Sequence, residues 1–324
     1  MPRQQRPAGR LPEAFGWVIV APLAVCAGAR VAQLDEASSL LLLAAGLTTW
    51  LWPPALVALA VGLWRGRPLL AVVAAATSAI LLASAVAGLG VPVRAPAAGT
   101  GPAVRLFTAN IHDANPDVGS IAEEVAATAP DLVALQEVDP DGAAGLARSG
   151  ALERFPYSVI ETRRGASGIA LWSRFPLVNA QVQDVQGRPF IGATVLVGAH
   201  RLRVYTVHMV APIDGDRARW RAQLRRVGEE VGGAHGALVV AGDFNATRYH
   251  PSFRRLLSDG MRDAHERRGR GWAATWPRNR RPLPPLLRLD HVLVSQGVEV
   301  RSIREGLGQG SDHRPIIADL VLLP

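Results

Sequence analysis

The chain has 324 residues, 49% of them hydrophobic, and a net charge of +8. This hydrophobic share is high for a purely soluble protein and indicates that part of the chain lies in a membrane. All 35 basic residues are arginine, which excludes a Walker phosphate-binding loop and a Schiff-base lysine. The single cysteine, Cys26, excludes an internal disulfide and a cysteine-rich zinc site.

The positive charge is spread unevenly. Residues 1–94 hold seven arginines and three acids, which leaves 28 basic and 24 acidic residues for the rest of the chain. That remainder could attract a phosphate-bearing substrate. It lacks the strong basic excess of a dedicated nucleic-acid-binding protein.

Three long apolar stretches, residues 15–34, 39–63 and 68–91, dominate the N-terminal part of the chain. Each is about long enough to cross a hydrocarbon core of roughly 30 Å. The sequence therefore predicts a membrane region over residues 1–91 with about three transmembrane helices. A secretory signal peptide is an alternative for the first stretch only, and the other two would still keep the chain in the membrane.

Flanking charges predict the orientation of these helices. Three arginines precede the first stretch and two separate the second from the third, whereas Asp35 and Glu36 follow the first. The excess of arginine on cytoplasmic segments places the N-terminus inside and the chain after residue 94 outside the cytoplasm. Pro53 and Pro54 indicate a kink in the second stretch, and a re-entrant hairpin there would give an even number of crossings and reverse this location.

Residues 92–103 are rich in proline, glycine and alanine and are predicted to be a linker. In residues 104–324, short apolar runs alternate with amphipathic stretches, a texture typical of layered α/β or α+β domains. The predicted strands are 104–111, 131–136, 157–161, 168–172, 190–197, 202–208, 237–242, 291–294 and 315–322. The predicted helices are 117–128, 140–149, 214–232 and 250–258. Many strands and few helices favour two packed sheets flanked by helices.

Polar residues that chemistry commonly uses stand at or just beyond the ends of many of these strands. They are Asn110, Glu137, His208, Asp243, Asn245, Asp290, Asp312 and His313. Each has a plain alternative, because a strand-end Asp or Asn usually caps a turn and a lone histidine is more often a hydrogen-bonded core residue. Since so many strands end in this way, we expect these side chains to share one rim of the domain.

The order of these motifs resembles the endonuclease/exonuclease/phosphatase superfamily, which includes DNase I, abasic-site endonucleases, neutral sphingomyelinases and inositol-polyphosphate phosphatases. The resemblance covers residues 104–322 and is carried by "LQEV", "VHM", "GDFN" and "SDHRP", with "SGIALWSRFP" and "TWP" as supporting segments. It implies a DNase I-like four-layer α/β sandwich of the α+β class, in which helices flank two packed mixed β-sheets. Abasic-site nucleases have Thr-Lys where Val138 and Asp139 follow Glu137, so the sequence departs most from the DNA-repair members.

A family resemblance of this kind also implies a divalent metal ion. Oxygen ligands without cysteine suit Mg²⁺ or Mn²⁺. Glu137 is the first expected metal ligand, and Asn110 and Asp312 would complete or support its shell.

The remaining residues are expected to act on the substrate. Asp243 and Asn245 are two apart, so their side chains can leave an extended segment on the same side. Asp243 would orient or deprotonate the attacking water, and Asn245 would hold a phosphate oxygen. His313 would donate to the phosphate while Asp290 holds its tautomer, and His208 would contact the phosphate from another side.

The substrate is less well defined. Arg278, Arg280 and Arg281 could bind a polyanion or anionic lipid headgroups, and the plain alternative is a solvated proline-rich loop. The leading hypothesis is a membrane-anchored phosphoesterase acting on a phospholipid headgroup or another extracytoplasmic phosphoester, because a tether raises the local concentration of a membrane substrate. An exported nuclease acting on DNA or RNA is the alternative, followed by a non-catalytic binding protein anchored in the lipid bilayer.

Overall fold

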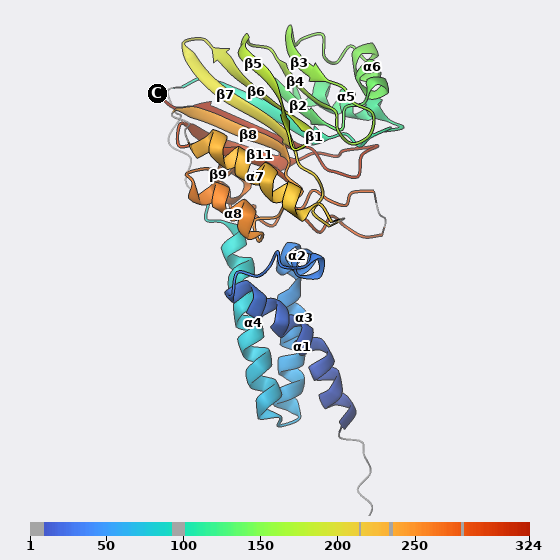
Figure 1. Cartoon of the computed structure of the whole chain (residues 1–324), viewed down its shortest axis with the longest axis vertical. Helices are drawn as coiled ribbons and strands as arrows, with labels where there is room; N and C mark the ends of the chain where they lie inside the picture. Colours follow the sequence, from blue (N-terminus) through green and yellow to red (C-terminus); the bar gives the residue numbers. More distant parts are fainter. Residues whose placement is uncertain (1–9, 93–100, 214, 233–235, 280–281) are drawn as a thin grey trace, which may run out of the picture. The chain divides into compact units, whose positions relative to one another are not determined.

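The computed structural model describes residues 10–92, 101–213, 215–232, 236–279 and 282–324. Residues 93–100 of the predicted linker lie outside the described residues. The chain divides into two compact units (Figure 1). The first runs to Gly88 and includes Arg248–Pro251; the second comprises Leu89–Thr247 and Ser252–Pro324.

The first unit contains four helices: α1 (Arg10–Val31), α2 (Ser39–Gly46), α3 (Thr48–Trp64) and α4 (Pro68–Leu89). By length and composition, α1 and α4 could each cross a membrane. Helices α2 and α3 meet this criterion only as a pair, and they are bent by 89° relative to each other. The described residues therefore provide two candidate spans, or three if the bent pair counts as one, where the sequence predicted about three.

The bend between α2 and α3 lies at Leu47, and α3 continues through Pro53 and Pro54, where the kink was predicted. Gly46 and Thr48 flank the break, and both residue types have low helix propensity. The Thr48 hydroxyl donates to a carbonyl of the preceding helix 2.6 Å away. A local side-chain bond of this kind competes with continued helix.

The second unit is built on two six-stranded sheets. The first has the order β11-β12-β1-β2-β4-β3 and the second the order β5-β6-β7-β8-β10-β9. The strands of the first are β1 (Ala103–Asn110), β2 (Leu132–Gln136), β3 (Tyr157–Glu161), β4 (Ile169–Ser173), β11 (Val298–Glu305) and β12 (Ile316–Leu322). Those of the second are β5 (Leu177–Val185), β6 (Arg188–Val197), β7 (His200–His208), β8 (Ala237–Asp243), β9 (Arg262–Asp263) and β10 (Asp290–Val294). Both sheets are mixed, since β1 and β2 pair in parallel, as do β7 and β8, while the other pairs are antiparallel.

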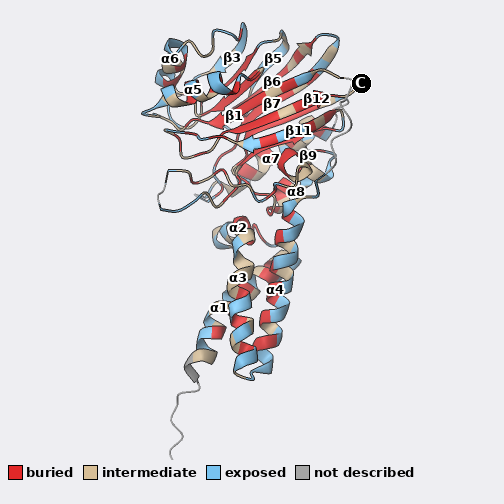
Figure 2. Cartoon of the chain, turned by 180° about the vertical axis from the view of Figure 1, so that it is seen from behind, coloured by how far each residue is buried: buried red, intermediate tan, exposed pale blue. Residues whose placement is uncertain are grey.

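Helices cover the outer faces of the two sheets (Figure 1). Helices α5 (Val118–Thr128) and α6 (Pro140–Arg148) pack against the first sheet, and their apolar faces join its outer side chains in one buried cluster. Helix α7 (Arg217–Gly232) covers the second sheet, and α8 (Pro251–Ser258) and α9 (Ala264–Arg267) follow in the chain. A separate buried core lies between the sheets (Figure 2). The predicted four-layer sandwich is confirmed.

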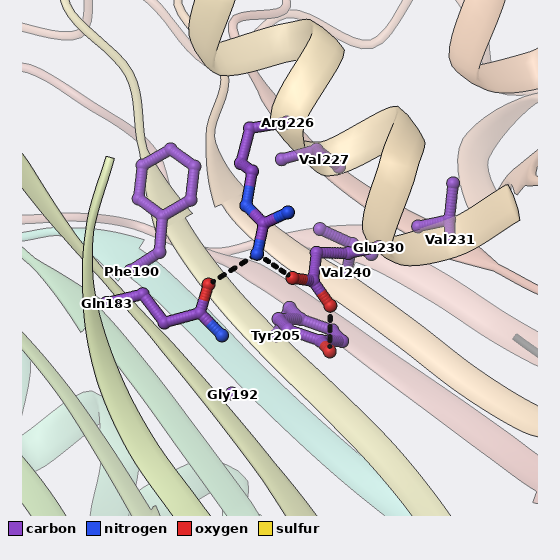
Figure 3. Close-up of a pocket in the computed structure, with 9 residues that line it drawn as sticks. All are labelled: Gln183, Phe190, Gly192, Tyr205, Arg226, Val227, Glu230, Val231 and Val240. Atoms are coloured by element: carbon purple, nitrogen blue, oxygen red, sulfur yellow. Dashed lines mark hydrogen bonds and ion pairs between the residues drawn. The ribbon is translucent and has the colours of Figure 1, made fainter. Parts of the chain in front are cut away.

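Helix α7 shows how the sequence pattern becomes packing. Its apolar positions recur every three or four residues, and Trp220 and Leu224 among them are buried. Polar groups complete the contact with the sheet: Arg226 donates to the side-chain oxygen of Gln183 in β5 at 3.3 Å and pairs with Glu230 of the same helix (Figure 3). Glu230 in turn accepts a hydrogen bond from the Tyr205 hydroxyl of β7 at 2.7 Å, so these contacts hold α7 against β5 and β7.

The strands and helix that the sequence did not predict are β5, β9, β11 and α9. Strands β5, β9 and β11 are edge strands of the two sheets. Most residues of β5 are partly or fully exposed, and β11 has a bulge between Val300 and Ser302. Because an edge strand needs no continuous apolar run, the signal that revealed the central strands is missing there.

Candidate active site

One edge of the paired sheets collects the polar residues singled out by the sequence. In the first sheet β1 ends at Asn110, and β2 ends one residue before Glu137. In the second sheet β7 ends at His208, β8 ends at Asp243, and β10 begins at Asp290. Strand register aligns Asp243 with both His208 and Asp290. The sequence predicted one shared rim, and the structure brings these residues to one.

Gly242 permits the close approach that places Asp243. Its φ is +140°, and a Cβ there would lie 2.0 Å from the carbonyl oxygen of Val207 on the neighbouring strand. We expect Gly242→Ala to lower the free energy of unfolding by about 1–3 kcal/mol, because the backbone must shift or strain. Thermal unfolding checks this. The matched control is Gly232→Ala in α7, where a Cβ would meet no atom within 4 Å, and equal losses for both variants would contradict the assignment.

Asn110 links the two sheets at the centre of the site. Its side-chain nitrogen donates to Glu137 Oε1 at 2.8 Å and to Asp243 Oδ2 at 3.1 Å. The ring of His208 lies close to both carboxylates, with Nε2 3.7 Å from Glu137 Oε1 and 3.7 Å from Asp243 Oδ2. Four side chains at or next to the ends of four strands are thus linked by contacts within hydrogen-bond or ion-pair range.

Glu137 adopts a left-handed backbone conformation, with φ of +61°. Such a conformation is uncommon for residues other than glycine and costs on the order of 1–3 kcal/mol unless its surroundings stabilise it. The amide N–H of Asp113 donates to Glu137 Oε2 at 2.8 Å and helps to fix the carboxylate. The carboxylate keeps some access to solvent, as 14% of the side chain is exposed.

Asp243 is buried, and this burial raises the pKa of its carboxyl to about 7, although the nearby His313 cation opposes the shift. The prediction that Asp243 and Asn245 share one face of an extended segment is wrong. Strand β8 ends at Asp243, and Asn245 has φ of +45° in a turn where its N–H donates to Asp243 Oδ1 at 2.8 Å. The turn still leaves the two side chains neighbours, with Asn245 Nδ2 3.5 Å from Asp243 Oδ2 and 2.9 Å from the carbonyl of Met209.

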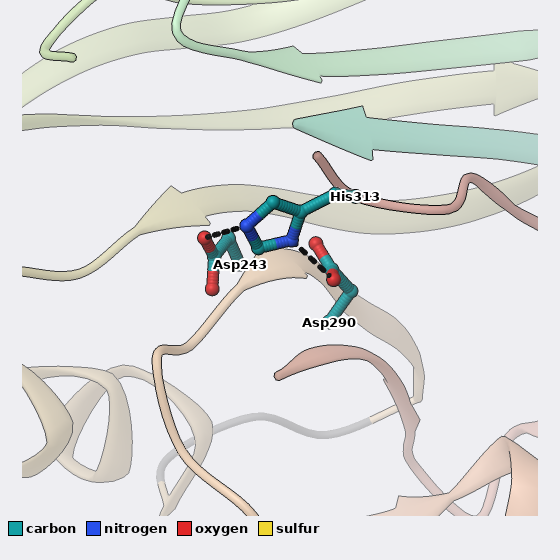
Figure 4. A group of neighbouring side chains, drawn as sticks. All are labelled: Asp243, Asp290 and His313. Atoms are coloured by element: carbon teal, nitrogen blue, oxygen red, sulfur yellow. Dashed lines mark hydrogen bonds and ion pairs between the residues drawn. The ribbon is translucent and has the colours of Figure 1, made fainter. Parts of the chain in front are cut away.

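His313 and Asp290 form a tight buried pair (Figure 4). His313 Nδ1 lies 2.8 Å from Asp290 Oδ2, and its Nε2 lies 3.8 Å from Asp243 Oδ2. Burial disfavours the charged ring, but the carboxylates of Asp290 and Asp243 outweigh it and raise the pKa of His313 to about 10. Ser311 holds the segment in place by donating to the carbonyl of Asn110 at 2.7 Å while accepting from the His313 N–H.

His208 has the opposite electrostatic setting. Burial, followed by the positive charges of Arg188 and His313, holds its pKa well below the usual range. The ring is therefore neutral at physiological pH. Its Nδ1 is buried without a hydrogen-bond partner among the residues that the structure describes.

Asp312 lies at the outer side of the site. Its Oδ2 accepts a hydrogen bond from the Trp276 ring nitrogen at 3.1 Å, and its Oδ1 lies 3.4 Å from His112 Nδ1 and 4.0 Å from His313 Nε2. The backbone N–H of Arg278 donates to the carbonyl of Asp312 at 2.7 Å. Arg280 and Arg281 lie outside the described residues.

Comparison with known proteins identifies the family of the chain. Residues 107–313 match the model of the Endonuclease/Exonuclease/phosphatase family. The chain belongs to this family. Its members hydrolyse phosphoesters, and the chain is a phosphoester hydrolase of this kind. No curated protein matches it significantly.

Solved structures share the fold at low sequence identity. A humanized TDP2 from D. rerio has a TM-score of 0.59 and 18% identity, over 67% of this chain and 98% of that one. The 3' phosphatase NExo from Neisseria, bound to a product DNA hairpin, has a TM-score of 0.55 and 24% identity, over 66% of this chain and 98% of that one. An endonuclease/exonuclease/phosphatase from Beutenbergia cavernae has a TM-score of 0.54 and 22% identity, over 68% of this chain and 72% of that one.

The donor set of this family member fits a divalent cation. Asp243, Asp290 and His313 each offer a ligand atom, all within 4.8 Å of one another. However, His313 Nδ1 lies 2.8 Å from Asp290 Oδ2, and this hydrogen bond competes with a metal ion for the same ring nitrogen. The Glu137 carboxylate offers the oxygen atoms that Mg²⁺ and Mn²⁺ prefer, and the Asn110 side-chain nitrogen donates to it.

Several supporting residues had no clear signal in the sequence. The Thr275 hydroxyl accepts from the N–H groups of Leu289 and Asp290 at 3.1 and 3.3 Å and so fixes the start of β10. Thr275 belongs to the "TWP" segment, which the family resemblance marked only as supporting. Arg188 also lies at this edge, and nothing in its local sequence distinguished it from the many other arginines.

Proposed function

We propose that the chain is a membrane-anchored, divalent-metal-dependent phosphoesterase that attacks the phosphorus in line with a water activated by Asp243. The observation that carries the proposal is the convergence on the Asp243 carboxylate. Asn110 donates to its Oδ2 at 3.1 Å, and the ring nitrogens of His208 and His313 lie 3.7 and 3.8 Å from the same atom. These groups come from four separate segments of the chain, so local turn capping does not explain their arrangement.

Glu137 would hold the cation, and Asn110 and Asp312 would complete or support its shell. When bound, such an ion supplies positive charge that neutralises the phosphate. The Asn110 amide, whose nitrogen donates to Glu137, keeps the carboxylate oriented. This support resembles the hydrogen bonds that commonly orient metal-binding carboxylates in proteins.

Asp243 would take the proton from the attacking water. A carboxyl with a pKa of about 7 suits a general base at neutral pH, because a large fraction is ionised and yet basic enough to accept a proton. One N–H of the Asn245 amide is used by Met209. Its other N–H makes only the long 3.5 Å contact with Asp243, so a phosphoryl oxygen can replace that contact.

His313 would stabilise negative charge on the phosphoryl oxygens. Its ring carries a proton on Nε2, because Asp290 holds Nδ1 and the raised pKa keeps the ring cationic. A charged donor of this kind binds an oxyanion more strongly than a neutral one does. His208, which is neutral, would contact the phosphate without repelling the cation bound at Glu137.

The proposed substrate is a phospholipid headgroup or another extracytoplasmic phosphoester. The candidate membrane helices support this choice, since a tether raises the local concentration of a substrate in the same membrane. A nuclease or 3' phosphatase is the second candidate, and the structural similarity to NExo bound to a product DNA hairpin favours it. Arg278, half-buried beside Asp312, could contact the phosphate of a lipid headgroup or of a nucleic acid.

A substrate screen tests the proposal. The full chain, purified in detergent, would be assayed against DNA, RNA, sphingomyelin, phosphatidylinositol phosphates and simple phosphate esters, each with Mg²⁺, Mn²⁺ or EDTA. Hydrolysis that requires the metal supports the proposal, and its substrate pattern separates the lipid from the nucleic-acid candidate. If the chain cleaved none of these esters with either metal, the result would contradict the proposal.

We further propose that the catalytic unit lies outside the cytoplasm, with the bent pair α2–α3 crossing the membrane once. Arg65 and Arg67 between α3 and α4 support a cytoplasmic position for that turn. In a Cys26→Ser background, Ser258→Cys in the second unit should react with a membrane-impermeant maleimide in intact cells. The matched Arg65→Cys variant should react only after permeabilisation. The reverse pattern, with Ser258→Cys protected in intact cells, would show an even number of crossings.

A further inference from the structure

The site residues form an ordered row across the two sheets. Neighbouring strands in the first sheet are β12, β1, β2 and β4, and in the second they are β10, β8, β7 and β6. Cross-sheet pairs follow this order: His313–Asp290 at 2.8 Å, Asn110–Asp243 at 3.1 Å and Glu137–His208 at 3.7 Å. Each of these four strands of the first sheet thus lies opposite its counterpart in the second.

A fourth pair continues the row. Arg188 begins β6, whose register with β7 aligns Ile191 with Thr206 and so brings Arg188 to the level of the end of β7. On the opposite sheet, the N–H of Val138 bonds to the carbonyl of Gly168, which places Ser167 beside the Glu137 segment. Arg188 Nη1 donates to the Ser167 hydroxyl at 3.4 Å. The pair Ser167–Arg188 therefore stands next to the pair Glu137–His208.

The charge of Arg188 acts on residues of the site. Among the described residues, no carboxylate lies within 4.0 Å of its guanidinium, although the side chain is half-buried. Burial and the Arg219 cation lower the pKa of Arg188, while the carboxylates of Glu137, Asp243 and Asp216 raise it. The positive charge of Arg188 in turn lowers the pKa of His208. Arginine remains charged in such a setting. Its cation thus lacks the close carboxylate partner that a structural ion pair would provide.

We propose that Arg188 is a substrate-binding residue that takes an anionic oxygen of the phosphoester on the Glu137 side of the reacting phosphorus. This inference rests on the proposed function of the site. The cation of His313 stands at one end of the row and that of Arg188 at the other, with Glu137 and Asp243 between them. A bound phosphoester would therefore meet a positive charge on both sides. The planar guanidinium can offer two parallel N–H groups to such an oxyanion, and Ser167 keeps its plane oriented.

Three variants of Arg188 test this inference by separating charge from shape. Arg188→Lys keeps the charge, Arg188→Gln keeps polarity without charge, and Arg188→Ala removes both. With bis-p-nitrophenyl phosphate and Mg²⁺, kcat/KM should fall about 10- to 100-fold for Arg188→Ala and Arg188→Gln, and less for Arg188→Lys. Arg201→Ala, an exposed arginine at the far end of β7, is the matched control and should retain the wild-type value.

Direct binding of inorganic phosphate in the presence of Mg²⁺ is the second measurement, and it does not depend on turnover. Its dissociation constant should rise about tenfold in Arg188→Gln while the thermal midpoint stays at the wild-type value. If the wild type cleaves phosphoesters and the Arg188 variants match it in both kcat/KM and phosphate binding, this inference alone is overturned. If the wild type cleaves nothing and binds no phosphate, the proposed function fails with it.

Discussion

Replacing Asp243 with asparagine should lower kcat for bis-p-nitrophenyl phosphate by about 10²- to 10⁴-fold in the presence of Mg²⁺, the usual contribution of a positioned general base. Asn110 donates to Asp243 Oδ2 and the Asn245 N–H donates to Oδ1, so the single oxygen of an asparagine can keep one of these two bonds. Because asparagine also has the shape of the aspartate, the fold at the end of β8 should persist while the base is lost. Release of p-nitrophenolate by the full chain in detergent measures the effect.

Asp259→Asn is the matched control, because Asp259 is exposed just beyond α8. It should keep the wild-type rate. An Asp243→Asn protein that unfolds at the wild-type temperature and also hydrolyses the ester at the wild-type rate would remove Asp243 from the mechanism. The control thereby separates loss of one catalytic carboxylate from a general change in charge.

Replacing Glu137 with glutamine should abolish most of the stabilisation that Mg²⁺ gives the folded chain. A ligand present at 100 times its dissociation constant stabilises the folded state by about 2.7 kcal/mol. The wild type should therefore unfold at a higher temperature with saturating Mg²⁺ than with EDTA. The amide introduced by Glu137→Gln is a far weaker metal ligand than a carboxylate, so the variant should unfold at nearly the same temperature in both.

Glu153→Gln supplies the comparison for this experiment, because Glu153 is an exposed glutamate beyond α6 and is not one of the site residues. Its Mg²⁺-dependent shift should equal that of the wild type. A Glu137→Gln protein that retains the full shift would move the cation to another group, and the cluster of Asp243, Asp290 and His313 would be the next candidate.

The sequence predicted the central strands of both sheets because they are buried and strongly apolar. Strand β2, for example, is buried at every position. Edge strands carry a different pattern: β5 exposes most of its side chains to solvent, and the sequence did not reveal it. In the first unit, the composition predicted long apolar helices. The bend at Leu47 depends on local backbone and side-chain hydrogen bonds that hydropathy does not report.

For the site, the sequence predicted which residues gather and could not predict how they pair. Asn110 and Asp243 each follow an apolar run, and parallel strands bring such ends to the same edge of a sheet. The turn that carries Asn245 depends on its left-handed backbone, and the protonation of His313 depends on two carboxylates placed around it by the fold. Arg188 could be assigned to the site only from the strand order of the second sheet, which places it beside His208.

The most direct test of the central claim is diffraction from crystals of the full chain grown with Mn²⁺ and inorganic phosphate, using the anomalous signal of manganese. We expect one peak of anomalous density within bonding distance of the Glu137 carboxylate, and phosphate between this manganese ion and Nε2 of His313. A chain that hydrolyses phosphoesters at full rate while its manganese binds away from Glu137 and Asp243 would contradict the account.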